Sequence, residues 1–103
     1  MYRVVISGAE ATDRELLRLG CAVEYSADGE TWSALEGAPT SMALSLSAVR
    51  DVLRGDLDDV EKRVALLEMV RTTARALPAF RGLVAVEELE ELLPAGWPVT
   101  VTL

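Results

Sequence analysis

The chain has no histidine, no asparagine and no glutamine, and a single cysteine, Cys21, among its 103 residues. Histidine is the commonest general base and a frequent metal ligand, so its absence removes the usual means of catalysis near neutral pH. A lone cysteine forms no internal disulfide, which is typical of a reducing compartment. No apolar run reaches the roughly 20 residues that span a membrane, and no secretory leader pattern is present, so we expect a cytoplasmic protein.

Basic charge is also scarce. One lysine and nine arginines stand against 17 acidic residues, which gives a net charge of −7. The balance is −4 over residues 1–45, +1 over 46–82 and −4 over 83–103. Phosphate backbones repel such an acidic protein, which disfavours nucleic acid as a partner. Arg71, Arg75 and Arg81 form a local basic cluster that is either a partner-binding patch or a complement to the negative end of a helix dipole.

The overall composition is that of a globular protein, because half of the residues are hydrophobic and 26% are charged. A chain of this length supports a single hydrophobic core, so we expect residues 1–103 to form one domain. Segments with alternating apolar residues occur beside segments with helical spacing, which predicts the α+β class.

The strongest pattern predicts a long amphipathic helix over residues 57–77. Asp56 is its expected N-cap, and Pro78 ends it because the proline ring has no N–H and disfavours helical geometry at the preceding residue. Apolar residues recur at steps of three and four, and we expect them to form one buried stripe under the sheet: Leu57, Val60, Val64, Leu67, Val70, Ala74 and Leu77.

In the N-terminal half, β-branched residues and alternation predict strands near 2–7, 22–26 and 31–35. Asp28 and Gly29 favour a two-residue hairpin turn between the last two strands. That turn places Tyr25 opposite Trp32, with Val23 and the other apolar residues on the same face.

Residues 13–19 allow two interpretations. Thr12 and Glu15 match a capping box and Gly20 matches a C-cap, which predicts a short helix. The alternative is one extended strand that runs from Leu16 to Ser26, because short apolar runs fit either structure.

Further along, alternation predicts a strand near 41–46, and Ser47 caps a short helix near 48–54. Two helices joined at Gly55 invite comparison with a helix-turn-helix DNA-binding motif. Acidic residues would open its recognition helix, which again disfavours nucleic acid: Asp56, Asp58, Asp59 and Glu61.

The C-terminal part predicts a third helix near 84–93, ended by Pro94, and a terminal strand near 99–103 that pairs with the N-terminal strand or with another subunit. The predicted fold is therefore a small, mostly antiparallel sheet packed on the long helix and flanked by the two shorter helices.

The sequence contains no recognisable catalytic, cofactor-binding or metal-binding motif. Glycine-rich phosphate loops are absent. The adjacent acids Asp58 and Asp59 diverge by about 100° on a helix, and the glutamates of 84–93 fit a solvated helix face better than a cation site. We expect Cys21 to be buried and inert. No catalytic residue, cofactor or metal is therefore assigned.

Two classes of function remain. The first is a non-catalytic protein-interaction or assembly module, in an accessory or phage-derived role, that binds a protein partner or self-associates as a homo-oligomer. Aromatic residues and arginines are enriched at interfaces, and Trp97 has few chain neighbours to bury it. The candidate partner-binding residues are Tyr25, Trp32, Trp97, Arg71, Arg75 and Arg81.

The alternative is a small enzyme or ligand-binding protein that uses Asp, Glu and Arg side chains in a cleft between the sheet and the helices. We favour the interaction module, because a chain without histidine or a catalytic motif has few options for chemistry.

Overall fold

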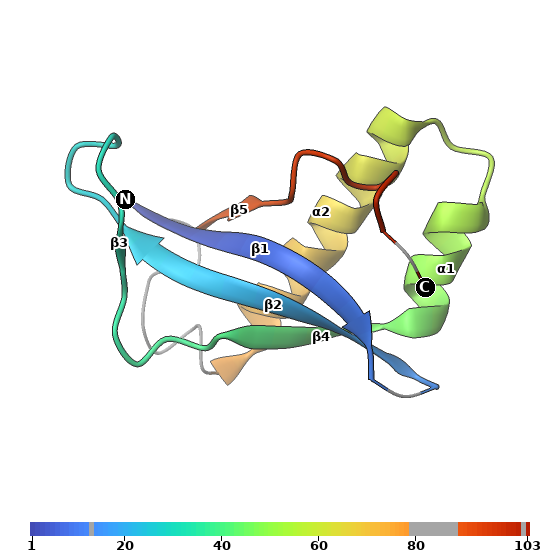
Figure 1. Ribbon diagram of the computed structural model, residues 1–103, viewed down its shortest axis with the longest axis horizontal. Helices are drawn as coiled ribbons and strands as arrows, with labels where there is room; N and C mark the ends of the chain where they lie inside the picture. The colour runs from blue at the N-terminus through green and yellow to red at the C-terminus, as the bar shows by residue number, and fades with distance from the viewer. Residues whose placement is uncertain (13, 79–88, 102) are drawn as a thin grey trace.

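A computed structural model describes residues 1–12, 14–78, 89–101 and 103, and within them a five-stranded sheet packs against two helices (Figure 1). The strands lie in the order β3-β2-β1-β5, and β4 pairs with β2 on the edge that β3 also uses. Helix α2 (Asp59–Ala76) crosses one face of the sheet and contacts both β4 and β5. The predicted α+β class, with a mostly antiparallel sheet on a long helix, is confirmed.

Strands β1 (Tyr2–Ala11) and β2 (Leu16–Tyr25) form an antiparallel hairpin at the centre of the sheet. Leu17, Leu19, Cys21 and Val23 are all buried, whereas the residues between them face the opposite side. This alternation decides between the two interpretations of residues 13–19: from Leu16 onward the chain is a strand, and the helix interpretation is wrong there. Residue 13 lies outside the described residues.

The predicted two-residue turn at Asp28 and Gly29 is wrong. Strand β3 (Ser33–Ala34) pairs with β2 so that Tyr25 faces Ser33, which leaves residues 26–32 as a longer loop. Gly29 does adopt the expected positive φ, at 80°. The loop is stabilised by side chains instead, because Asp28 Oδ1 accepts hydrogen bonds from the backbone N–H groups of Glu30 (2.8 Å) and Thr31 (2.9 Å).

Strand β4 (Ser41–Ser45) confirms the strand predicted near 41–46 and runs antiparallel to the first half of β2. Helix α1 (Leu46–Arg54) follows directly. It begins two residues before the predicted helix because Ser45, rather than Ser47, is the N-cap and accepts a hydrogen bond from the backbone N–H of Ala48. Leu46 and Val49 anchor α1 in the core.

The third helix predicted near 84–93 is wrong in its described part. Residues Leu89–Leu92 form strand β5, which runs parallel to β1 and pairs with Tyr2–Val5. Leu89 and Glu91 are buried while Glu90 is exposed, so the period is two. A glutamate on the buried face concealed this period in the sequence. Residues 84–88 lie outside the described part of the chain.

The terminal strand predicted near 99–103 is also wrong, since residues 95–100 form turns and residue 101 is irregular; residue 102 is outside the described chain. The Arg63 guanidinium donates hydrogen bonds to three backbone carbonyls of this segment, those of Leu93 (3.0 Å), Pro94 (2.7 Å) and Trp97 (2.9 Å). These bonds fix the backbone around Trp97, whose side chain is buried as a member of the core cluster.

Candidate interaction surface on helix α2

Helix α2 (Asp59–Ala76) is set by signals at both of its ends. Asp58 is its N-cap, where Oδ1 accepts a hydrogen bond from the backbone N–H of Glu61 at 2.8 Å, and this bond lowers the pKa of the Asp58 carboxyl. The predicted cap, Asp56, is wrong because it lies in the link between the two helices. Leu77 is the C-cap, and Pro78 follows it as expected.

The helix buries only part of its apolar surface. Leu66, Val70 and Ala74 are its buried residues, and they face the sheet. By contrast, Leu57, just before the helix, is 43% exposed, Val60 is 73% exposed and Val64 is 61% exposed. These three residues are spaced at three and four positions, so they form a short ridge on the outside of the helix. The expectation that they lie under the sheet is wrong.

The reason lies in the helix geometry. At about 100° per residue, the predicted stripe drifts around the helix axis by roughly 100° between its first three and its last three positions. The sheet covers the later positions, including Val70 and Ala74, and leaves the earlier ones outside. The same geometry places Leu66, which the predicted stripe omits, in the buried direction. The sequence alone could have shown from this drift that the first and the last positions of the stripe do not both face the sheet.

Two shallow hollows adjoin each other along α2. One, of about 460 Å³, is lined by Leu57, Val60, Glu61, Val64, Ala65 and Glu68. The other, of about 480 Å³, lies between α2, β4 and α1 and is lined by Leu44, Ser45, Val52, Ala65, Glu68, Met69, Thr72 and Thr73. Ala65 and Glu68 line both hollows, so they form one continuous surface, which we call the α2 face.

The charge on the α2 face is negative. Among the described residues, Glu61 and Glu68 are the ionisable side chains that line the two hollows. Two neighbouring cations are engaged elsewhere: Lys62 Nζ donates to the backbone carbonyl of Leu53 at 2.8 Å, and Arg63 holds the C-terminal segment. A third, Arg71, pairs with Glu68. The α2 face therefore combines an apolar ridge and groove with two exposed carboxylates.

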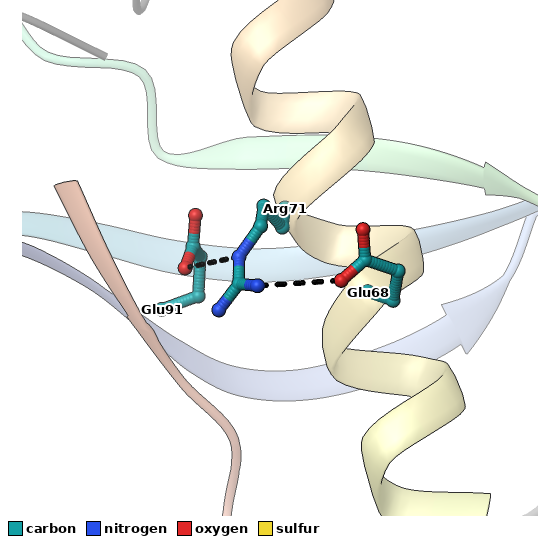
Figure 2. Close-up of polar contacts among 3 residues, drawn as sticks. All are labelled: Glu68, Arg71 and Glu91. Carbon is teal, nitrogen blue, oxygen red and sulfur yellow. Dashed lines mark hydrogen bonds and ion pairs between the residues drawn. The ribbon is translucent and has the colours of Figure 1, made fainter. Parts of the chain in front are cut away.

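Arg71, a candidate partner-binding residue, lies between two carboxylates (Figure 2). Its Nε is 3.3 Å from Glu91 Oε2 and its Nη1 is 3.3 Å from Glu68 Oε2. The Glu91 side chain is 2% exposed, whereas that of Arg71 is 38% exposed. Arg71 thus compensates a buried charge of β5, and this explains its position without a partner.

The aromatic candidates Tyr25 and Trp32 are not brought together. Tyr25 packs against Tyr2, with ring centroids 5.2 Å apart, on the side of the sheet that carries the core. The Arg3 guanidinium lies over the indole ring of Trp32, with Cζ 4.0 Å from the ring centroid. The same guanidinium forms an ion pair with Glu24, in which Nε is 2.8 Å from Oε1. The predicted cross-strand pair fails because the loop after β2 is longer than a two-residue turn.

The remaining candidates divide three ways. Trp97 is buried in the core, so the expectation that few neighbours cover it is wrong. Arg75 is exposed in the last turn of α2, where its charge suits the helix dipole. Arg81 lies outside the described residues.

The described residues contain no cluster of three or more cysteine, aspartate or glutamate side chains that could hold a metal ion. Cys21 is buried as predicted, and this desolvation raises the pKa of its thiol, which disfavours a reactive thiolate. A polar hollow of about 480 Å³ near Ser7 and Thr40 on the sheet contains an ion pair between Arg18 and Glu10, 3.1 Å apart and exposed. Exposed pairs of this kind are ordinary surface features.

Comparisons with family models, with curated proteins and with solved structures found no match for this chain. Within its described part, none of the helices has the length and apolar character needed to cross a membrane. The physical features of the α2 face are therefore the basis for a functional proposal.

Proposed function

We propose that this protein is a non-catalytic interaction module and that the α2 face is its docking surface. The observation that supports this proposal is the exposure of Val60 and Val64, two β-branched apolar residues on consecutive turns of one helix. Single exposed apolar residues are ordinary, but an apolar ridge beside an apolar groove is typical of a binding surface.

Burial of this surface would contribute favourably to the free energy of a complex. Full burial of a valine or leucine side chain contributes about 1.5–3 kcal/mol. Leu57, Val60 and Val64 could together supply several kcal/mol, before the groove near Met69 is counted. Helix α2 already satisfies its own backbone hydrogen bonds, so a partner would dock on a rigid, preformed ridge rather than order a loop.

The chain offers a matched control for this surface. Val99 is 75% exposed, which is nearly the same as Val60, but it lies in the C-terminal turns. The double substitution V60S/V64S would remove the apolar ridge, whereas Val99→Ser would replace an equally exposed valine outside the α2 face.

The test is site-specific crosslinking in the cells that produce the protein, with a photoreactive residue at position 64 or at position 99. The partner crosslinked through position 64 is purified and titrated by calorimetry against the wild type, V60S/V64S and V99S. We expect V60S/V64S to weaken binding at least tenfold and V99S to leave it unchanged. Equal affinities for all three proteins, or crosslinks from position 99 alone, would contradict the proposal.

A further inference from the structure

We infer that the occupant of the α2 face is an amphipathic helix of a different protein, with Lys or Arg beside its apolar strip. This inference rests on the proposed function of the α2 face and adds the chemistry of the partner. It follows from where Glu61 and Glu68 lie and from the charge of the chain.

The two glutamates stand between the apolar ridge and the apolar groove. Both line the hollow over Val60 and Val64, and Glu68 also lines the groove beside Met69. A partner that covers ridge and groove together must therefore remove both carboxylates from water. Burial of a carboxylate without full compensation of its charge is strongly unfavourable, so a stable complex requires cations opposite them.

Within the described residues, the chain compensates these two carboxylates only in part. Glu61 takes part in no ion pair there, and Glu68 shares Arg71 with the buried Glu91, because both carboxylates lie 3.3 Å from the same guanidinium. Glu61 and Glu68 are seven positions apart, which is about two helical turns along the same edge of α2. A docked helix with basic residues at the same seven-residue spacing would face both carboxylates.

The partner should be helical because α2 offers it no backbone hydrogen bonds. Every interior N–H and C=O of a helix is already paired, so an extended segment docked on α2 would leave its own backbone groups without protein partners. A helix satisfies its backbone internally and needs only apolar and charged side chains, as in helix-in-groove recognition.

A second copy of this chain fits less well. In an antiparallel pair of α2 helices related by a two-fold axis, each flank of one helix faces the same flank of the other. Glu61 and Glu68 would then lie against their own counterparts, in a complex of two chains that each carry a net charge of −7. An anionic membrane surface would meet the same repulsion.

The test uses three synthetic peptides of about 18 residues, a length that matches α2. The first has an apolar strip of leucine flanked by lysine at seven-residue spacing, and the second has glutamate in place of the lysine. The third has the composition of the first in scrambled order. Fluorescence anisotropy measures their affinity for the wild type, E61Q/E68Q, V60S/V64S and V99S, and light scattering measures self-association.

We expect the basic amphipathic peptide to bind at least tenfold more tightly than the acidic and the scrambled peptides. E61Q/E68Q should reduce the preference for the basic over the acidic peptide to about threefold or less, since the carboxylates then carry no charge. V60S/V64S should weaken binding of the basic peptide at least tenfold, and V99S should not change it.

The other outcomes separate the two proposals. Equal binding of the basic and acidic peptides, with loss in V60S/V64S, overturns the inference about charge and leaves the docking surface intact. Self-association that V60S/V64S abolishes overturns it in favour of a second copy. Binding that is unchanged in V60S/V64S overturns both the inference and the use of the α2 face. Absence of binding by all peptides to a monomeric wild type also overturns the inference.

Discussion

At the scale of single residues, the pair formed by Arg71 and Glu91 is unusual because its two members differ in exposure. Glu91 Oε2 accepts from Arg71, while Glu91 Oε1 is buried with no hydrogen-bond partner among the described residues. The Arg71 guanidinium contacts both water and Glu68, so its charge is stabilised even without Glu91. The buried Glu91 carboxylate, by contrast, has Arg71 as its counter-charge.

This asymmetry predicts unequal effects of mutation. Arg71→Met leaves a buried carboxylate without compensation, and we expect it to lower the free energy of unfolding by about 3 kcal/mol. Glu91→Gln leaves the arginine near Glu68 and solvent, and we expect a loss of only about 1 kcal/mol. Urea denaturation followed by circular dichroism measures both. Glu68→Gln is the control, with an expected effect below about 0.5 kcal/mol; a loss there equal to that of Arg71→Met would contradict this account.

A second prediction at this scale concerns pH. Hydrogen bonds from the backbone N–H groups of Thr31 and Glu30, and from the Ser26 hydroxyl, lower the pKa of the Asp28 carboxyl. A carboxyl with a lowered pKa in the folded state stabilises the protein above its unfolded pKa of about 3.9, and this contribution disappears as the pH falls through the folded value.

We therefore expect the urea midpoint of the wild type, relative to that of Asp28→Asn, to be constant from about pH 8 to pH 5 and to fall below about pH 4. The asparagine variant keeps an acceptor oxygen but has no charge to titrate. Asp58 also has a lowered pKa, but it is present in both proteins and cancels in the difference. A difference that grows on acidification would show that the sign of the Asp28 effect is wrong.

At the scale of elements, helix α2 has one surface that packs in the core and another that is exposed to solvent. Its sheet-facing side holds Leu66 at 2% exposure, whereas Val64, two positions earlier, is 61% exposed. Packing of the C-terminal part of the helix fixes its position on the sheet, so the ridge near its start is free to change without loss of the fold.

Alanine substitutions should separate the two surfaces. Leu66→Ala creates a cavity and should lower the free energy of unfolding by about 2–5 kcal/mol. Val64→Ala removes an exposed β-branched residue from a helix and should be neutral or stabilising by up to about 0.6 kcal/mol. Urea denaturation at two protein concentrations measures both. A concentration-dependent loss in Val64→Ala would mean that this residue is buried in a self-associated form.

Elements also show what the sequence predicts well. Alternation in Met42 and Leu44 predicted strand β4, and helical spacing together with Pro78 predicted both ends of α2 to within two residues. The strand β5 was missed because Glu91 occupies a buried position. A charged residue normally faces solvent, and the sequence does not show that Arg71 compensates the charge of Glu91. The hairpin was misplaced because the Asp28 side chain builds a loop that competes with a two-residue turn.

The candidate surface was harder to predict than the fold. Helical spacing identifies Val60 and Val64 as apolar positions on one side of α2, but it gives no direction to the sheet. That direction depends on Leu66 and on contacts with β4 and β5, which are distant in sequence. Burial of Trp97 likewise depends on Arg63, more than 30 residues away. Long-range contacts therefore decide which side chains remain available to a partner.

At the scale of the whole molecule, Arg63 connects α2 to the C-terminal segment through three carbonyls. Its planar guanidinium serves several acceptors at once, which a lysine ammonium on a flexible chain does less well. This one side chain positions Pro94 and Trp97, and with them the segment that follows β5.

Arg63→Met should lower the free energy of unfolding by about 2–4 kcal/mol, since hydrogen bonds to charged groups contribute about 1.5–3 kcal/mol each before neighbours readjust. Arg63→Lys should recover only part of that loss. In a Trp32→Phe background, Trp97 emission should shift to longer wavelength in Arg63→Met as the indole meets water. An unchanged emission maximum together with unchanged stability would contradict the role of Arg63.

The parallel pairing of β1 with β5 also has a mechanical consequence. Tension applied at Tyr2, where β1 begins, and at Leu92, where β5 ends, pulls these neighbouring strands in opposite directions along their length. The hydrogen bonds between them are then loaded together in shear instead of being opened one after another. Under tension between those two points, β1 and β5 would therefore be the strands that resist unfolding of the chain.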